Sequence, residues 1–104
     1  MLKRRGYLVG FEAKGHAGYA EEGHDIVCSA VSALVQTVLL GLSERLQLPL
    51  EQCMEPGDMR VQLSNDCTAA QLEQAAILLD TLQLGLRSMA LGYGEYLKLT
   101  QREV

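Results

Sequence analysis

A histidine and a cysteine flank a glycine-rich segment near the start of the chain. Residues 15–34 read GHAGYAEEGHDIVCSAVSAL, with His16 beside the first glycine and Cys28 at the start of a strongly apolar stretch. A helix N-terminus favours the thiolate form of a cysteine, and a nearby imidazole can take up the thiol proton. An imidazole and a thiol are the minimum for a cysteine nucleophile. His16 and Cys28 are therefore the first candidates for acyl-transfer chemistry, most simply peptide hydrolysis.

Two other interpretations of these residues stand beside the catalytic one. A cysteine alone at the start of an apolar helix is typical of a small buried core residue. His16, His24, Asp25 and Cys28 also carry atoms that can ligate a metal, but their spacing matches no specific zinc pattern. We expect no bound metal and no cofactor.

Two polar residues could support the pair. Asp25 is either the N-cap of a helix that starts at Ile26, which we favour, or a group that orients His16. Ser32 lies one helical turn after Cys28. Its hydroxyl could hydrogen-bond near the thiol or to the backbone carbonyl of Cys28.

The segment from 15 to 23 is expected to be a loop. It contains three glycines, and such a loop could move and close as a lid over a substrate. The loop residues that could contact a substrate are Gly15, Ala17, Gly18 and Gly23.

The composition restricts the classes of protein that remain. The chain has 104 residues, enough for one domain spanning 1–104, and its net charge of −4 argues against direct nucleic-acid binding. We expect no membrane-spanning stretch and no signal peptide. Three cysteines without a CxxC pair favour free thiols in the cytoplasm.

Periodicity and turn residues predict the elements that position the pair. We expect a strand over 7–13 with Gly10 as a bulge, a helix over 26–47, a hairpin of strands over 50–55 and 59–63, and a last strand over 96–99. Thr68 and Gln71 fit a capping box for a second helix that stops near Gly92. The order β-α-β-β-α-β predicts an α+β two-layer sandwich, with two helices packed on one small, mostly antiparallel sheet.

The first helix is apolar on two sides. We expect it to be central in the fold, or central and also covered by a second copy of the chain. One stripe comprises Val27, Val31, Leu34, Val38, Leu42 and Leu46, and a second face comprises Ala30, Ala33 and Leu40.

Several motifs together resemble the ribosomal-processing cysteine protease family called Prp. They are Gly15-His16-Ala17, then Gly23-x-Asp25-x-Val27-Cys28, then Ala30-x-Ser32-Ala33-Leu34. Two further stretches, QTVLLGL over 36–42 and LQLGLRS over 82–88, lie where the family has similar helices. The resemblance covers nearly the whole chain.

The resemblance implies a small homodimeric cytoplasmic protease. It implies that the protein removes a short N-terminal extension from protein number twenty-seven of the large ribosomal subunit before ribosome assembly. The family's nucleophile falls on Cys28 and its base on His16, while its motif aspartate and serine fall on Asp25 and Ser32. Only residues 1–6 precede the first predicted strand, so the family's first strand should be shortened, and His24 replaces an expected lysine or other polar residue.

A different class of function stays open. The protein could be a non-catalytic ribosome-assembly or protein-binding module, as a shortened first strand or a substrate without an extension would suggest. A metal-binding protein using His16, His24 and Cys28 is a third alternative.

Overall fold

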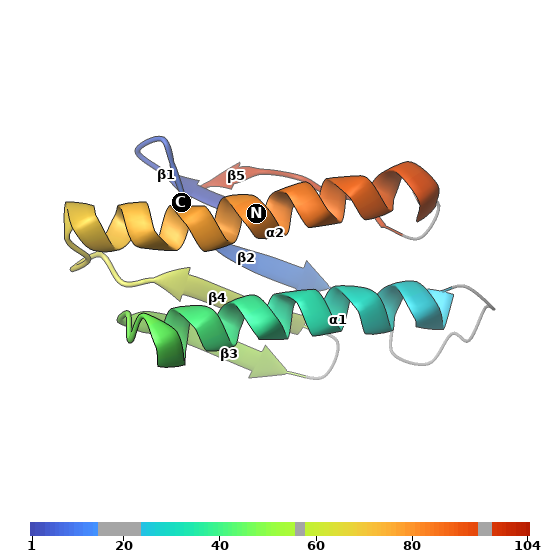
Figure 1. Cartoon of the computed structure of the whole chain (residues 1–104), viewed down its shortest axis with the longest axis horizontal. Helices are drawn as coiled ribbons and strands as arrows, with labels where there is room; N and C mark the ends of the chain where they lie inside the picture. Colours follow the sequence, from blue (N-terminus) through green and yellow to red (C-terminus); the bar gives the residue numbers. More distant parts are fainter. Residues whose placement is uncertain (15–23, 56–57, 94–96) are drawn as a thin grey trace.

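Two helices cover one face of a five-stranded sheet (Figure 1). The computed structural model describes residues 1–14, 24–55, 58–93 and 97–104, without the side chains of His24, Asp25 and Tyr93. The elements in chain order are β1 (Leu2–Arg4), β2 (Tyr7–Lys14), α1 (His24–Leu40), the π-helical turn η1 (Gly41–Arg45), β3 (Leu50–Glu55), β4 (Asp58–Leu63), α2 (Ala69–Tyr93) and β5 (Arg102–Glu103). The predicted α+β sandwich of two helices on one sheet is confirmed.

The sheet is mostly antiparallel, with the strand order β3-β4-β2-β1-β5. The pairs β3–β4, β4–β2 and β2–β1 are antiparallel, whereas β5 runs parallel to β1. β1 is shortened to three residues, as expected, and lies between β2 and β5. Its Lys3 and Arg4 are therefore strand residues.

β1 and β2 are joined by a tight turn. Arg5 and Gly6 both have positive φ, 52° and 85° respectively, which is the pattern of a type I′ hairpin turn. The pairing then shifts by one residue, because Lys3 pairs with Leu8 whereas Leu2 pairs with Gly10. The bulge that was predicted at Gly10 is confirmed.

The last strand differs from the prediction. Residues 97–99 are not in a strand, and β5 is instead Arg102–Glu103. The backbone N–H groups of Arg102 and Val104 donate to the carbonyls of Met1 and Lys3 over 3.0 and 2.9 Å. The position of β5 thus depends on its pairing with the short β1. The residue pattern over 96–99 gives no information about that pairing.

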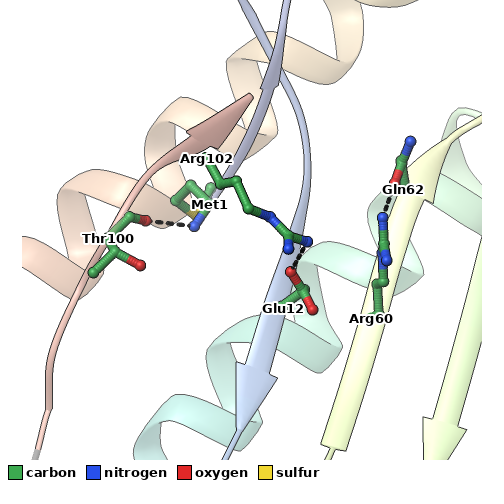
Figure 2. A network of polar contacts seen from close by, with 6 residues as sticks. All are labelled: Met1, Glu12, Arg60, Gln62, Thr100 and Arg102. Carbon is green, nitrogen blue, oxygen red and sulfur yellow. Dashed lines mark hydrogen bonds and ion pairs between the residues drawn. The ribbon is translucent and has the colours of Figure 1, made fainter. Parts of the chain in front are cut away.

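Polar contacts hold the two ends of the chain together (Figure 2). The Met1 ammonium donates to the carbonyl oxygen of Thr100 over 2.7 Å. An ion pair joins Arg102 of β5 to Glu12 of β2, across the intervening β1. On β4, the guanidinium of Arg60 donates to the side-chain oxygen of Gln62 over 2.9 Å.

The core lies between the sheet and the helices. It is aliphatic apart from Phe11, which pairs with Val61 in the centre of the sheet. The buried residues are Val27 and Val35 of α1, Leu42 of η1, and Ala75, Leu79, Leu82 and Leu86 of α2. Leu34, expected in the core stripe, is instead 36% exposed, because Val35 occupies the side of α1 that faces the sheet.

The start of α2 is capped as predicted. The Gln71 N–H donates to the hydroxyl of Thr68 over 3.1 Å, and the Thr68 N–H donates to the side-chain oxygen of Gln71 over 2.8 Å. This reciprocal pair is a capping box. At the other end, the helix continues through Gly92 and stops at Tyr93.

The expectation about membrane-spanning stretches is corrected. Residues Ile26–Arg45, with a mean hydropathy of 2.0, are long and apolar enough to cross a membrane by length and composition. Core helices of globular proteins satisfy the same criterion, and one side of this stretch is buried through Val27 and Val35 of α1 and Leu42 of η1. The other side of α1 remains exposed, including the apolar side chains of Ile26, Leu34 and Leu40.

Candidate active site

Cys28 lies near the start of α1, on the border between its buried and its exposed sides. Val27 beside it is 2% exposed, Ile26 is 66% exposed, and Cys28 is half-buried between these extremes. A thiol at such a border is partly shielded by the protein and partly accessible to solvent. This placement differs from that of a fully buried core cysteine, which was the simplest alternative.

α1 begins earlier than the sequence predicted. Its first residue is His24, so Cys28 is the fifth helical residue and lies one turn beyond the free N–H groups of the helix start. Because Cα–Cβ bonds in a helix tilt toward its N-terminus, the thiol still leans back toward that first turn. The electrostatic influence of the helix start falls off within about one turn, so Cys28 lies at the limit of its range.

Asp25 does not have the predicted place in the helix. It is the second helical residue rather than the residue that caps it, because α1 starts two residues before the expected Ile26. Helix starts commonly shift by this much, and His24 offers no sequence signal that would exclude it from the helix. The Asp25 side chain lies outside the described structure, so its orienting role stays a prediction.

Ser32 lies one turn after Cys28 and interacts with a residue that the sequence analysis did not single out. The Ser32 hydroxyl oxygen accepts a hydrogen bond of 2.8 Å from the side-chain nitrogen of Gln36. Cys28, Ser32 and Gln36 follow one another at intervals of four residues and therefore share one side of α1. That spacing was visible in the sequence and could have identified Gln36 as the third member of a polar row.

The other half of the candidate pair lies in a part of the chain that the structure does not describe. His16 and the loop residues Gly15, Ala17, Gly18 and Gly23 fall in residues 15–23. The described structure places both ends of this segment. β2 ends at Lys14 and runs toward the end of the molecule where α1 begins (Figure 1). The chain therefore leaves β2 and enters α1 at one end of the molecule, which is where His16 would have to act on Cys28.

The other two cysteines have different surroundings. The cysteines at 28, 53 and 67 all lie in described parts of the chain and form no disulfide, in agreement with the sequence analysis. Cys67 packs against the core, and burial raises the pKa of its thiol. Cys53 is exposed on β3 because its side chain points to the face of the sheet opposite the helices.

Two of the hollows on the described surface lie away from Cys28. One of about 630 Å³ lies between the second half of α2 and residues 99–101. One of about 290 Å³ lies on the β3–β4 hairpin and is lined by Glu51, Gln52, Cys53, Arg60 and Gln62. Within the residues described, no three His, Cys, Asp or Glu side chains group as metal ligands. The metal alternative involves His16 and His24, so it is not tested by that observation.

Comparison with known families identifies the class of protein to which this α+β chain belongs. The family model described as "Cysteine protease Prp" matches residues 1–98. The chain therefore belongs to the Prp family of cysteine proteases. The resemblance proposed from the motifs around His16 and Cys28 is confirmed.

Solved structures share the fold of this chain. The crystal structure of SMU.848 from Streptococcus mutans is 26% identical, with a TM-score of 0.81 over 99% of this chain and 94% of that one. An essential ribosomal processing protease Prp from S. aureus, in complex with a substrate peptide, is 20% identical, with a TM-score of 0.81 over 93% of this chain and 90% of that one. The same protease with a covalently linked product peptide gives a TM-score of 0.76 at 21% identity, over 93% and 90% of the two chains. No curated protein matches the chain.

Proposed function

We propose that this protein is a cytoplasmic endopeptidase that removes the N-terminal extension from the precursor of protein twenty-seven of the large ribosomal subunit. The observation that carries the proposal is the match of the Prp family model to residues 1–98. The S. aureus relative, described as a ribosomal processing protease, supports the same class of substrate. The position of Cys28 on the border of α1 supports its assignment as the nucleophile.

The proposed reaction needs one nucleophile and one base. Cys28 attacks the scissile carbonyl through its sulfur, while His16 takes the thiol proton and then gives a proton to the leaving amine. The amine departs as the C–N bond breaks, leaving an acyl group on the sulfur of Cys28. Water, deprotonated by His16, then hydrolyses the thioester and restores the thiol. Backbone N–H groups at the start of α1 are candidates to stabilise the oxyanion.

A double-mutant cycle tests the assignment of the pair. Groups that act as one catalytic unit are not additive, so Cys28→Ala, His16→Ala and the double variant should lose nearly the same factor in kcat/KM. Asp25→Asn and Ser32→Ala should lose less, because these residues are proposed to support the pair. Losses of His16→Ala and Cys28→Ala that multiply in the double variant would show that the residues act independently. A precursor that binds but is never cleaved would favour the non-catalytic binding module.

We also propose that the protein is a homodimer. Large apolar side chains are exposed on the outer sides of both helices: Ile26, Leu34 and Leu40 on α1, and Ile77, Leu84 and Leu91 on α2. Ile77, Leu84 and Leu91 recur every seven residues and so lie along one side of α2. A second copy of the chain would bury this apolar surface, so no membrane is needed to cover it. The net charge of −4 gives no support for nucleic acid as the partner.

The oligomeric state can be measured directly. Light scattering of the parent protein at micromolar concentration should give the mass of two chains. Leu84→Asp should give one chain, because Leu84 is 64% exposed and its replacement places a charge in the contact without disturbing the core. Asp80→Asn, on the exposed side of the same helix, is the matched control. A parent protein of single-chain mass would contradict the proposal.

A further inference from the structure

The outer edge of β3 is unpaired in the sheet. β3 is the first strand in the order β3-β4-β2-β1-β5, so among the described strands only β4 hydrogen-bonds to it. All of its residues from Glu51 to Glu55 are exposed. Its pairing with β4 is regular over six residues, without the bulge or internal proline that commonly protects an edge. Such an edge is a template for an additional strand.

One hydrogen bond defines which backbone groups the edge presents. The Ser64 N–H donates to the Pro49 carbonyl over 2.9 Å, which makes positions 49 and 64 a hydrogen-bonded pair. Hydrogen-bonded and non-hydrogen-bonded pairs alternate in an antiparallel ladder. The pair of Cys53 with Arg60 is therefore of the bonded kind, and the pairs of Gln52 and Met54 are not. The N–H and C=O groups of Gln52 and Met54 accordingly point outward, available to a further strand.

The side chains along this edge carry negative charge. Glu51 and Glu55 share the face of the sheet away from the helices, because their partners alternate with the buried Val61 and Leu63. Neither glutamate forms an ion pair with any residue that the structure describes. The neighbouring Arg60 donates to Gln62 instead, as Figure 2 shows. The hollow of about 290 Å³ on the same hairpin offers space for a side chain of an added strand.

The charges favour a basic partner over a second copy of this chain. In the antiparallel register that pairs Cys53 with its own counterpart, Glu51 of one strand would lie directly opposite Glu55 of the other. Like charges at opposite positions destabilise a strand pair. A ribosomal protein segment has the opposite character, because it neutralises RNA phosphates with lysine and arginine.

We propose that the free edge of β3 binds an extended, basic segment of the substrate polypeptide as an additional strand. The segment pairs with the outward backbone groups of Gln52 and Met54, and its basic side chains face Glu51 and Glu55. β3 points toward the end of the molecule where α1 begins (Figure 1), so a bound segment leads toward the end that carries Cys28. The inference rests on the proposed function for the identity of the polypeptide, whereas the edge itself is a property of the described structure.

The test uses a fluorescent peptide that covers the extension and the first dozen residues of the mature ribosomal protein. Its dissociation constant is measured by anisotropy with Cys28→Ala protein, so that binding is separated from cleavage. Glu51→Lys and Glu55→Lys should each weaken binding about threefold to tenfold, and raised salt should weaken binding to the parent edge. Glu73→Lys, which makes the same change of charge on the exposed side of α2, is the matched control.

A second arm tests the backbone contacts. Met54→Pro removes one outward N–H and leaves the β3–β4 ladder intact, so it should weaken binding at least about tenfold. Met54→Ala keeps that N–H and measures the contribution of the side chain alone. N-methylation of alternate peptide amides needs no change to the protein. One alternating set should abolish binding and the other should be tolerated, since only every second N–H of an added strand faces β3.

The outcomes separate this inference from the proposed function. In one outcome, the parent protein cleaves the peptide, the β3 variants bind it as tightly as protein with the unchanged β3, and all N-methylated peptides bind as tightly as the unmodified peptide. The edge then does not bind substrate, and the inference is wrong. If the peptide binds with the expected dependence on β3 but the parent never cleaves it, the proposed function is wrong and the edge inference holds. A peptide that does not bind at all overturns the edge inference.

Discussion

Gly10 of β2 lies directly against the backbone of Val61 on β4. A Cβ atom at Gly10 would come within 2.1 Å of the Val61 carbonyl oxygen and 2.8 Å of the Gln62 Cα. Both neighbours are backbone atoms of a paired strand, so they cannot move aside as a flexible side chain could. This contact holds β2, the strand that precedes His16 in the chain, close against β4 in the centre of the sheet.

Gly10→Ala should therefore destabilise the protein by more than about 3 kcal/mol, beyond the usual cost of an overpacked site. Gly92→Ala is the control, because nothing lies within 4 Å of the added atom, and it should stabilise α2 by up to about 1 kcal/mol. Urea unfolding of both variants measures the difference. Equal midpoints for the two variants would mean that β2 and β4 can separate at little cost.

The capping box at the start of α2 should contribute measurably to stability. Thr68→Ala removes the hydroxyl that accepts from the Gln71 N–H, so we expect a loss of about 1 kcal/mol. Thr81→Ala removes a hydroxyl of the same kind in the middle of the helix, where it donates to the Ile77 carbonyl, and should cost little. Thermal unfolding followed by circular dichroism checks both. A Thr68→Ala variant as stable as Thr81→Ala would contradict the role of the cap.

The cysteines outside the candidate site should differ in reactivity. Cys53 is exposed and should react readily with iodoacetamide in the folded protein. Cys67 should react slowly at neutral pH, because burial raises the pKa of its thiol and keeps it protonated. A raised pKa favours folding while the thiol is protonated, so this contribution is complete below the ordinary thiol pKa and is lost as pH rises through the raised value. Peptide mapping after timed alkylation at pH 7 and pH 9 measures both rates, and faster labelling of Cys67 than of Cys53 would contradict the assignment.

The local elements of the fold were predictable because their signals are local. The alternating residues of β3 and β4 and the Thr68–Gln71 box depend on neighbours in sequence, and the structure confirms them. β5 was misplaced because its position depends on the Met1 and Lys3 carbonyls, which are nearly the whole chain away. No pattern within residues 96–104 records that pairing.

The candidate site shows the same division. The border position of Cys28 depends on which side of α1 meets the sheet, and periodicity alone chose Leu34 where the structure buries Val35. Helix periodicity leaves such a rotation uncertain when a helix is apolar on two sides. The family resemblance, in contrast, depended on the spacing of residue types around His16 and Cys28, which the sequence contains in full.

The central claim is that Cys28 makes this protein a processing protease, and one measurement tests it most directly. The purified precursor of ribosomal protein twenty-seven is incubated with the parent protein, with Cys28→Ala and with Cys53→Ala, and its intact mass is followed over time. The account predicts loss of the N-terminal extension with the parent and with Cys53→Ala, and an unchanged precursor with Cys28→Ala. Cleavage by Cys28→Ala at the parental rate, or an intact precursor in all three samples, would contradict it.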